Sequence, residues 1–183
     1  MEQLLDQLHQ YARIESGELG ARREVISLAE LADETVEALS PIAERRGVSI
    51  AAVADGPGRV EVNVTEIARV LRNLLDNAIR HSPRGGRVTL SIRDAAGTGV
   101  GGTVRVDVTD EGPGFPDSFR PIAFEPFTRA DEARSSGSSG LGLAIAKALI
   151  EGHGGTIALG HGPGGDVIVE LPPAARRPGA APV

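Results

Sequence analysis

The sequence predicts an α/β fold, a two-layer sandwich in which three main helices cover one face of a mixed sheet of about five strands. In residues 28–45, 63–81 and 141–152, apolar side chains recur every three to four positions, as in helices with one buried face. Shorter segments alternate apolar and polar residues, as strands buried on one side do. Helices and strands that each have one apolar face bury it by packing as two layers.

Residues 1–16 are predicted to form a helix that ends before Gly17. Two heptads are too few to hold a dimer, so we expect a monomer or a weak dimer. Residues 17–27 are predicted to be a linker followed by a short strand. We therefore divide the chain into a segment of residues 1–20, a main domain of residues 21–172 and a tail. Four apolar side chains of the first helix have the spacing of a helix–helix seam: Met1, Leu4, Leu8 and Tyr11.

The next helix begins at a capping box. Ser27 and Glu30 are three residues apart immediately around the first apolar position, so each side chain can satisfy a backbone N–H of the first turn. The helical pattern continues to Arg45, and Pro41 predicts a kink. Short strands are predicted after this helix, at residues 48–53 and 59–62.

A second box, Asn63 and Glu66, precedes the most strongly amphipathic helix of the chain. Along the edge of its apolar face, polar residues recur every three or four positions, so their side chains stack. Amides offer carbonyl oxygens to a hard cation, and guanidinium groups bind phosphate oxygens. The alternative is a solvated helix edge. The residues on this edge are Asn73, Asn77, Arg80 and His81.

Residues 103–109 alternate as a strand, and the same alternation places Asp110 on the apolar side with Val104, Val106 and Val108. A carboxylate facing a core is costly unless something donates hydrogen bonds to it. An acceptor at the floor of an apolar slot suits an exocyclic amine such as that of adenine. The alternative is a strand-end aspartate that caps a turn. Gly112 and Gly114 would let a flat ligand approach the backbone.

The third feature is a glycine-rich loop, residues 137–143, that leads into the helix of residues 141–152. Such a loop exposes backbone amides at the positive end of a helix, where phosphates bind. It lacks the Lys of a Walker A loop and the third glycine of a dinucleotide fingerprint. The strand of Val88, Leu90 and Ile92 is predicted to pair with that of residues 103–109 through a glycine-rich hairpin. Strands near residues 155–160 and 166–171 are predicted to end the sheet. We expect the tail, residues 173–183, to be disordered.

Composition fits one compact domain. The chain has 183 residues, of which 40% are apolar, and it has no cysteine, which excludes disulfides and thiolate metal sites. The net charge of −6 argues against non-specific binding of nucleic acid. No apolar run approaches the ~20 residues that span a bilayer, so we expect no membrane contact by this chain.

Taken together, these segments resemble the N, G1, F and G2 boxes of sensor histidine kinases. The resemblance covers roughly residues 24–172. It identifies the chain as a member of the GHKL superfamily, the catalytic and ATP-binding domain with the Bergerat fold. The matching segments, in order, are Asn73 to Asn77, Asp110-x-Gly112-x-Gly114, Phe124 to Phe127, Gly140 to Leu143, and His153-Gly154-Gly155.

The resemblance implies ATP and Mg²⁺ as the ligands of this domain. Asn77 is then the Mg²⁺ ligand, Asp110 binds the adenine amine, and Gly112 and Gly114 lie under the base. Arg80 and His81 lie near the phosphates. We assign catalytic roles to Asn73, Asn77 and Arg80. The remaining predicted site residues belong to the F and G2 boxes: Phe124, Phe127, Arg129, Gly140, Leu141, Gly142 and Leu143.

Asn73 favours a kinase over an ATPase. In the gyrase-, Hsp90- and MutL-like members of the superfamily, a Glu at the position of Asn73 orients the hydrolytic water, and an amide cannot act as that general base. The expected function is transfer of the ATP γ-phosphoryl group to a histidine. The alternatives are a nucleotide-binding regulatory module without transfer activity and a serine-protein kinase of the anti-sigma-factor type.

The phosphoacceptor histidine of the family is absent, because His9 is followed by Gln10 and Tyr11 rather than by an acidic residue. His153 and His161 are interpreted as loop or turn residues. We therefore expect the partners to be ATP or ADP, a histidine-containing dimerisation domain and, indirectly, a response regulator. Residues 1–20 resemble the end of the second dimerisation helix and its linker. Full receptors of this family carry membrane and sensor segments upstream, so this chain resembles a fragment of one or a soluble relative. The expected location of this fragment is cytoplasmic, whether or not the full-length protein is anchored in a membrane.

The segment between the F and G2 boxes is the one we expect to move. Residues 130–140 are polar, rich in serine and almost without apolar anchors, so they cannot bury enough surface to hold one conformation. We interpret them as a mobile ATP lid whose base is packed by Phe124 and Phe127, with Arg129 or Arg134 reaching the phosphates. Plain core packing is the alternative for the phenylalanines. Protease cutting within this segment should therefore change when Mg²⁺-ATP is added.

Overall fold

The computed structural model describes residues 22–95, 102–129 and 139–175. The predicted N-terminal helix, most of the predicted lid and residues 176–183 lie outside these ranges. Within the described residues, no helix is both long enough and apolar enough to cross a membrane.

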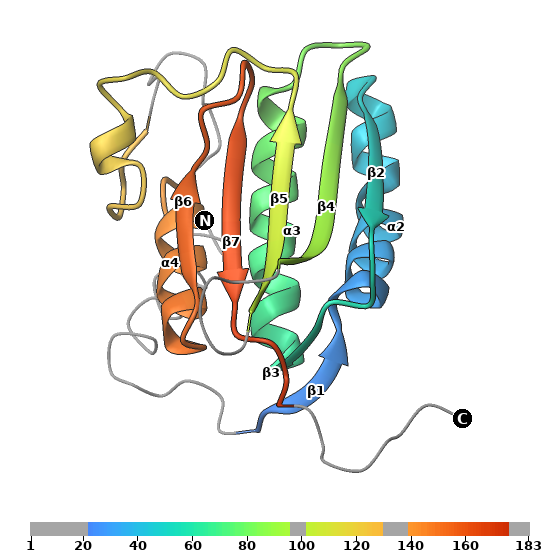
Figure 1. Cartoon of the computed structure of the whole chain (residues 1–183). Coiled ribbons are helices and arrows are strands. Elements are labelled where there is room, and N and C mark those ends of the chain that lie inside the picture. The colour runs from blue at the N-terminus through green and yellow to red at the C-terminus, as the bar shows by residue number, and fades with distance from the viewer. Residues whose placement is uncertain (1–21, 96–101, 130–138, 176–183) are drawn as a thin grey trace.

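Five strands form the main sheet in the order β2-β4-β5-β7-β6. β2 runs parallel to β4, and each of the other neighbouring pairs is antiparallel, so the sheet is mixed as predicted. Figure 1 shows all three helices on the same side of this sheet, which confirms the two-layer α/β sandwich. The strands are β2 (Ser49–Ala54), β4 (Arg87–Ala95), β5 (Thr103–Asp110), β6 (Thr156–Leu159) and β7 (Asp166–Leu171).

The three helices begin and end where local signals place them. Ser27 accepts a hydrogen bond from the Glu30 N–H at 3.3 Å, and Asn63 accepts one from the Glu66 N–H at 3.2 Å, so both predicted helix starts are confirmed. The first helix ends at Gly47, whose φ of 70° is the left-handed conformation that glycine adopts most easily. The helices are α2 (Leu28–Arg46), which continues through Pro41, α3 (Val64–His81) and α4 (Gly142–Gly152).

The core lies between the helices and the inner face of the sheet. Its strand residues alternate as predicted, and those of β5 and β7 are at most 5% exposed. α3 contributes its whole predicted apolar face, which includes Leu74, Leu75 and Ile79. The inner-face residues of the central strands are Val88, Leu90 and Ile92 on β4, Val104, Val106 and Val108 on β5, and Val167, Val169 and Leu171 on β7.

A two-stranded ribbon lies beside this sandwich. β1 (Glu24–Ser27) pairs antiparallel with β3 (Arg59–Val62). Pro173 forms a bridge with Val60, and the Ala174 N–H donates to the Arg59 carbonyl oxygen at 2.8 Å. The prediction that the disordered tail begins at Pro173 is therefore wrong for Pro173 and Ala174, because both pair with β3.

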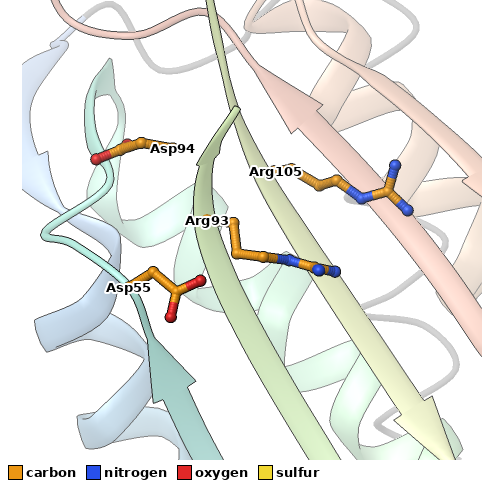
Figure 2. Close-up of a pocket in the computed structure, with 4 residues that line it drawn as sticks. All are labelled: Asp55, Arg93, Asp94 and Arg105. Atoms are coloured by element: carbon orange, nitrogen blue, oxygen red, sulfur yellow. The ribbon is translucent and has the colours of Figure 1, made fainter. Parts of the chain in front are cut away.

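The outer face of the sheet carries a buried carboxylate, paired with two partly exposed arginines, that alternation alone does not predict. Asp107 is only 5% exposed, although it lies on the face opposite Val106 and Val108. Arg93 and Arg105 approach its carboxylate from neighbouring positions at 2.6 and 2.7 Å. Next to this pair is a pocket of about 410 Å³, shown in Figure 2, lined by Asp55, Arg93, Asp94 and Arg105. It lies across the sheet from the residues predicted to form the functional site.

Candidate functional site

Three elements bring most of the predicted site residues together. α3 supplies Asn73, Asn77 and Arg80, β5 ends at Asp110, and α4 begins at Gly142. The Asn73 Nδ2 atom donates to the carbonyl oxygen of Gly142 at 3.4 Å, a long hydrogen bond that joins the N box directly to the G2 box.

Asp110 has the hydrogen-bond donors that its position requires. Its Oδ1 atom accepts the backbone N–H of Gly112 at 2.7 Å and that of Gly165 at 3.2 Å. The backbone N–H of Asp110 also donates to the Gly165 carbonyl oxygen at 2.8 Å. Because both side-chain bonds are made by Oδ1, Oδ2 is left as an acceptor without a hydrogen bond among the described residues. The carboxylate is thereby held in one orientation.

Glycines surround this carboxylate because larger residues do not fit. A Cβ atom at Gly112 would lie 2.6 Å from both the Asp110 Oδ1 atom and the His81 carbonyl oxygen, and one at Gly165 would overlap Asp110 Oδ2. Gly114 has a φ of 75°, and its Cβ would meet the Gly164 carbonyl oxygen at 3.0 Å. At Gly112 and Gly114 the atoms that exclude a larger side chain belong to the protein itself, and the approach of a flat ligand to their backbone stays a prediction.

Sequence reasoning missed Gly164 and Gly165, which form the opposite wall of the Asp110 site. Both lie in the loop between β6 and β7, just before the strand that pairs with β5. The available signal was the run of glycines at 162, 164 and 165 directly before a predicted strand. Nothing in the sequence alone indicates that this run meets Asp110.

The predicted polar residues lie along one edge of α3, and Asp76 on the same helix is a further member of this group. Asn77 is half-buried and makes no side-chain hydrogen bond among the described residues. Arg80 forms an ion pair with Asp76 at 2.6 Å, one turn earlier on the same helix. Arg80 must therefore share or leave Asp76 in order to contact a ligand, and Asp76 was not among the predicted site residues.

His81 lies at the end of α3 in a mixed electrostatic environment. Partial burial lowers its pKa below the ordinary value, and the positive charges of Arg80 and Arg46 act in the same direction. The negative charge of Asp110 opposes them but does not outweigh them. His81 nevertheless remains exposed, so water screens part of each effect. A free site therefore favours the neutral imidazole.

The F and G2 boxes meet through their backbones. The Phe127 N–H donates to the Gly140 carbonyl oxygen at 3.0 Å, which joins the two ends of the predicted lid. Phe124 is half-buried, but Phe127 is 57% exposed, so plain core packing does not hold for Phe127. Packing of the lid by either ring stays a prediction, because residues 130–138 lie outside the described ranges. Arg129 is half-buried next to residues 130–138.

The start of α4 is open. Leu141 is fully buried and occupies the N-cap position, where it offers no side-chain cap, while Leu143 packs against the core. A Cβ atom at Gly142 would meet nothing within 4 Å. The space beside the Gly142 Cα atom is therefore open among the described residues, and no side chain caps the N–H groups of the first turn. Such an uncapped N-terminus suits an anion.

Comparisons with known proteins agree with this geometry. Residues 62–175 match the family described as "Histidine kinase-, DNA gyrase B-, and HSP90-like ATPase". The sensor protein SphS of Synechococcus elongatus is 36% identical over 93% of this chain. The sensor histidine kinase component HK1 of Mycobacterium tuberculosis is 42% identical over 69% of this chain and 72% of its own length.

Solved structures include the same architecture. Full-length ShkA in complex with AMPPNP matches 93% of this chain with a TM-score of 0.79 and 27% identity. This chain spans 43% of the length of SphS and 35% of the ShkA chain, so it corresponds to part of each. The chain therefore belongs to the histidine kinase-, DNA gyrase B- and HSP90-like ATPase family, and it is an ATP-binding catalytic domain of the sensor histidine kinase type.

Proposed function

We propose that this chain binds ATP and Mg²⁺ between α3, the end of β5 and the start of α4, and transfers the γ-phosphoryl group to a histidine on a separate dimerisation domain. The observation that carries the proposal is the state of Asp110. Two backbone N–H groups hold Oδ1, and Oδ2 remains as an acceptor at the edge of an apolar layer. The exocyclic amine of adenine is a donor that fits it.

The residues on α3 suit a triphosphate with Mg²⁺. The Asn77 amide oxygen has no competing hydrogen bond, and no group of three or more His, Cys, Asp or Glu side chains in the described ranges offers another metal site. A single amide fits Mg²⁺, which completes its coordination with water and phosphate oxygens. When bound, the ion neutralises charge that develops on the transferring phosphoryl group. Arg80 and the open first turn of α4 are the further candidates to hold phosphate oxygens.

The side chain of Asn73 supports transfer over hydrolysis. It occupies the position where an ATPase needs a general base, and an amide cannot take a proton from water. Its Nδ2 atom instead holds the carbonyl oxygen of Gly142 at 3.4 Å. Asn73 therefore positions the start of α4, and water bound nearby is not activated by it.

In the proposed transfer, an imidazole nitrogen of the acceptor forms a bond to the γ-phosphorus while the bond to the β–γ bridging oxygen breaks. ADP leaves with that electron pair. The proton that the imidazole loses goes to a base on the acceptor's own domain or to water, because Asn73 and Asn77 cannot take it. This chain contributes orientation and charge neutralisation.

Calorimetry of nucleotide binding tests the site. We expect the wild type to bind Mg²⁺-ATP and ADP, Asp110→Ala to lose both, and Asn77→Ala to lose the dependence of ATP affinity on Mg²⁺. Asp94→Ala is the matched control, because Asp94 is an exposed carboxylate near the far end of β4, whose residue Val88 at the other end pairs with Asp110. Absence of binding by the folded wild type would reject the nucleotide site and would leave the four boxes as scaffold only.

The acceptor is tested separately. The chain is mixed with a phosphoacceptor dimerisation domain and radiolabelled ATP, and the phosphorylated product is treated with acid. Acid-labile, alkali-stable label is expected for phosphohistidine. Acid-stable label would instead support a serine-protein kinase of the anti-sigma-factor type, and nucleotide binding without any label would support the regulatory module. We further propose that a response regulator receives the phosphoryl group and that this domain works in the cytoplasm.

A further inference from the structure

His153 connects two helices at the end farthest from the nucleotide site. It follows α4 directly as the C-cap residue and lies in a turn, as the sequence predicts, but its side chain is only 2% exposed. Its Nδ1 atom lies 2.8 Å from the Leu149 carbonyl oxygen of the same helix. Its Nε2 atom lies 3.1 Å from the backbone nitrogen of Asn63, the N-cap residue of α3.

These partners determine how the imidazole is protonated. A carbonyl oxygen can only accept, so Nδ1 carries the hydrogen and donates it to Leu149. The Asn63 N–H can only donate, so Nε2 accepts. The ring therefore uses both nitrogens, one within α4 and one across to α3. Glu66 lies beside the same nitrogen, with its Oε2 atom 3.4 Å from Nε2.

The contact between the Asn63 N–H and His153 replaces one of the two hydrogen bonds of a capping box. In a complete box, the residue three positions after the N-cap returns a side-chain bond to the N-cap N–H. Here the Glu66 N–H donates to Asn63 as expected, but the Asn63 N–H is bound by His153 from another helix. The start of α3 is thereby completed only when α4 lies next to it.

The two helices run antiparallel, and both ends of α4 are joined to α3, one to its start and one to its middle. Asn73 contacts Gly142 at the start of α4, and Asn63 contacts His153 at its end. With a rise of about 1.5 Å per residue, these two contacts are roughly 15 Å apart along each helix. Between them the apolar faces pack, with Ile67 and Leu149 both buried. Apolar packing alone lets helices slide or rotate by small amounts, whereas a hydrogen bond at each end removes that freedom.

We propose that His153 is a positioning residue for nucleotide binding. By joining the C-cap of α4 to the N-cap of α3, it fixes the relative placement of the helix that carries Asn77 and the helix whose first turn faces the phosphates. His153 contacts no part of that site itself. This inference rests on the proposed nucleotide site, and the experiment below separates the failure of one from the failure of the other.

Two substitutions of similar size and polarity separate the two nitrogens. The amide of His153→Asn reaches only the Nδ1 position, so it can keep the bond to Leu149 but loses the bond to Asn63. The longer His153→Gln reaches the Nε2 position, where its oxygen can accept from Asn63 and its nitrogen can donate to Glu66. If His153 only stabilises α4, His153→Gln should be the more harmful change, because it loses the bond to Leu149. If His153 positions the two helices, His153→Asn should weaken nucleotide affinity more, because it loses the bond to Asn63.

Three quantities are measured for the wild type, both variants and Asp110→Ala: the midpoint of thermal unfolding, the Kd for Mg²⁺-ADP, and the ¹H–¹⁵N signals of the Asn73 side-chain amide. Affinity is measured well below the lowest midpoint, so that every variant used is folded. We expect His153→Asn to raise the Kd by about fivefold or more, since small misplacements of positioned groups are costly. We expect the Kd of His153→Gln to stay within about twofold of the wild type, and its Asn73 signals to lie where those of the wild type lie.

Equal affinity of folded His153→Asn and wild type would overturn the proposal. A loss of affinity in folded His153→Gln would also overturn the proposal. If His153→Asn does not fold, the affinity of His153→Gln alone tests it. Failure of the wild type to bind Mg²⁺-ADP would instead reject the nucleotide site. Tight binding by the wild type, lost in Asp110→Ala, keeps the site and makes the comparison of the His153 variants decisive.

Discussion

The backbone N–H of Phe127 donates to the carbonyl oxygen of Gly140 at 3.0 Å, although the two residues belong to different boxes. Both residues have positive φ, 64° at Phe127 and 70° at Gly140. A positive φ is unusual for phenylalanine and costs about 1–3 kcal/mol, so it persists only where the surrounding structure enforces it. The bond to Gly140 therefore holds a strained turn at the base of the predicted lid.

Gly140→Ala should loosen this base. A Cβ atom there would lie 2.8 Å from the Phe127 carbonyl carbon and the Thr128 carbonyl oxygen, in addition to the cost of its positive φ. We expect more than about 1 kcal/mol lost from the free energy of unfolding without nucleotide. Urea unfolding measures this loss.

Gly142→Ala is the matched control for that experiment. A Cβ atom at Gly142 meets nothing within 4 Å, so the unliganded stability should be near that of the wild type. If the start of α4 holds phosphates, Gly142→Ala should nevertheless weaken Mg²⁺-ATP binding, because the added methyl group would occupy ligand space. A Gly142→Ala protein as unstable as Gly140→Ala would contradict the expected stability, and unchanged Mg²⁺-ATP affinity would contradict the expected loss of binding.

Asp110→Asn should change the preferred base. The Asn oxygen can still accept from Gly112 and Gly165, which leaves the NH₂ group where Oδ2 now lies. A donor at that place repels the adenine amine and favours a keto oxygen. We expect ATP affinity to fall by about 1–3 kcal/mol and inosine triphosphate to become the better ligand. Competition between the two nucleotides measures this, and unchanged ATP affinity in Asp110→Asn would reject the assigned role.

Asp107 should contribute stability that depends on pH. Burial alone raises its pKa, but the hydrogen bonds and charges of Arg105 and Arg93 outweigh burial and hold the pKa below the ordinary value. The ionised form is thus favoured in the folded state. Its contribution is present above the unfolded-state pKa of about 3.9 and is lost as the pH falls through the folded-state pKa.

Asp107→Asn should therefore cost roughly 1–3 kcal/mol of the free energy of unfolding at pH 7, and less below about pH 4. Urea unfolding at both pH values measures the difference between the variant and the wild type. Asp94→Asn serves as the control, since Asp94 is exposed and forms no ion pair among the described residues. A cost for Asp107→Asn that is the same at both pH values would show that the ion pair is not its source.

His81 should titrate below the ordinary histidine value of about 6.5 in the free protein. Its pKa is lowered by burial first and then by Arg80 and Arg46. The unfolded chain therefore binds more protons, and the free energy of unfolding should rise with pH from the folded-state pKa up to about 6.5.

Nuclear magnetic resonance of the chain, which has four histidines, measures this pKa directly, and His81→Asn identifies the signal. Bound Mg²⁺-ATP should raise the His81 pKa if the imidazole lies near the phosphates, because the anion favours the charged ring. A pKa that does not move on binding would place His81 away from the phosphates.

Most of the architecture was predictable from local patterns. A periodicity of 3.6 predicted the apolar face of α3, and a periodicity of 2 predicted the burial of Val104, Val106 and Val108. The spacing of the capping boxes predicted the caps at Ser27 and Asn63. The burial of Asp107 was not predictable, because alternation assigns it to the solvent side. Its two arginines come from positions 93 and 105, and only strand pairing brings them to one carboxylate.

Within the candidate site, the sequence by itself determined which side chains are suited to a nucleotide: Asn77 on the edge of its helix and Asp110 on the apolar side of its strand. The tertiary structure decided what holds them. Gly165 meets Asp110 across 55 residues, and His153 meets Asn63 across 90 residues. Periodicity reports only which way a side chain faces within its own element. The partner across a sheet or between helices depends on register and packing, which exist only once the chain has folded.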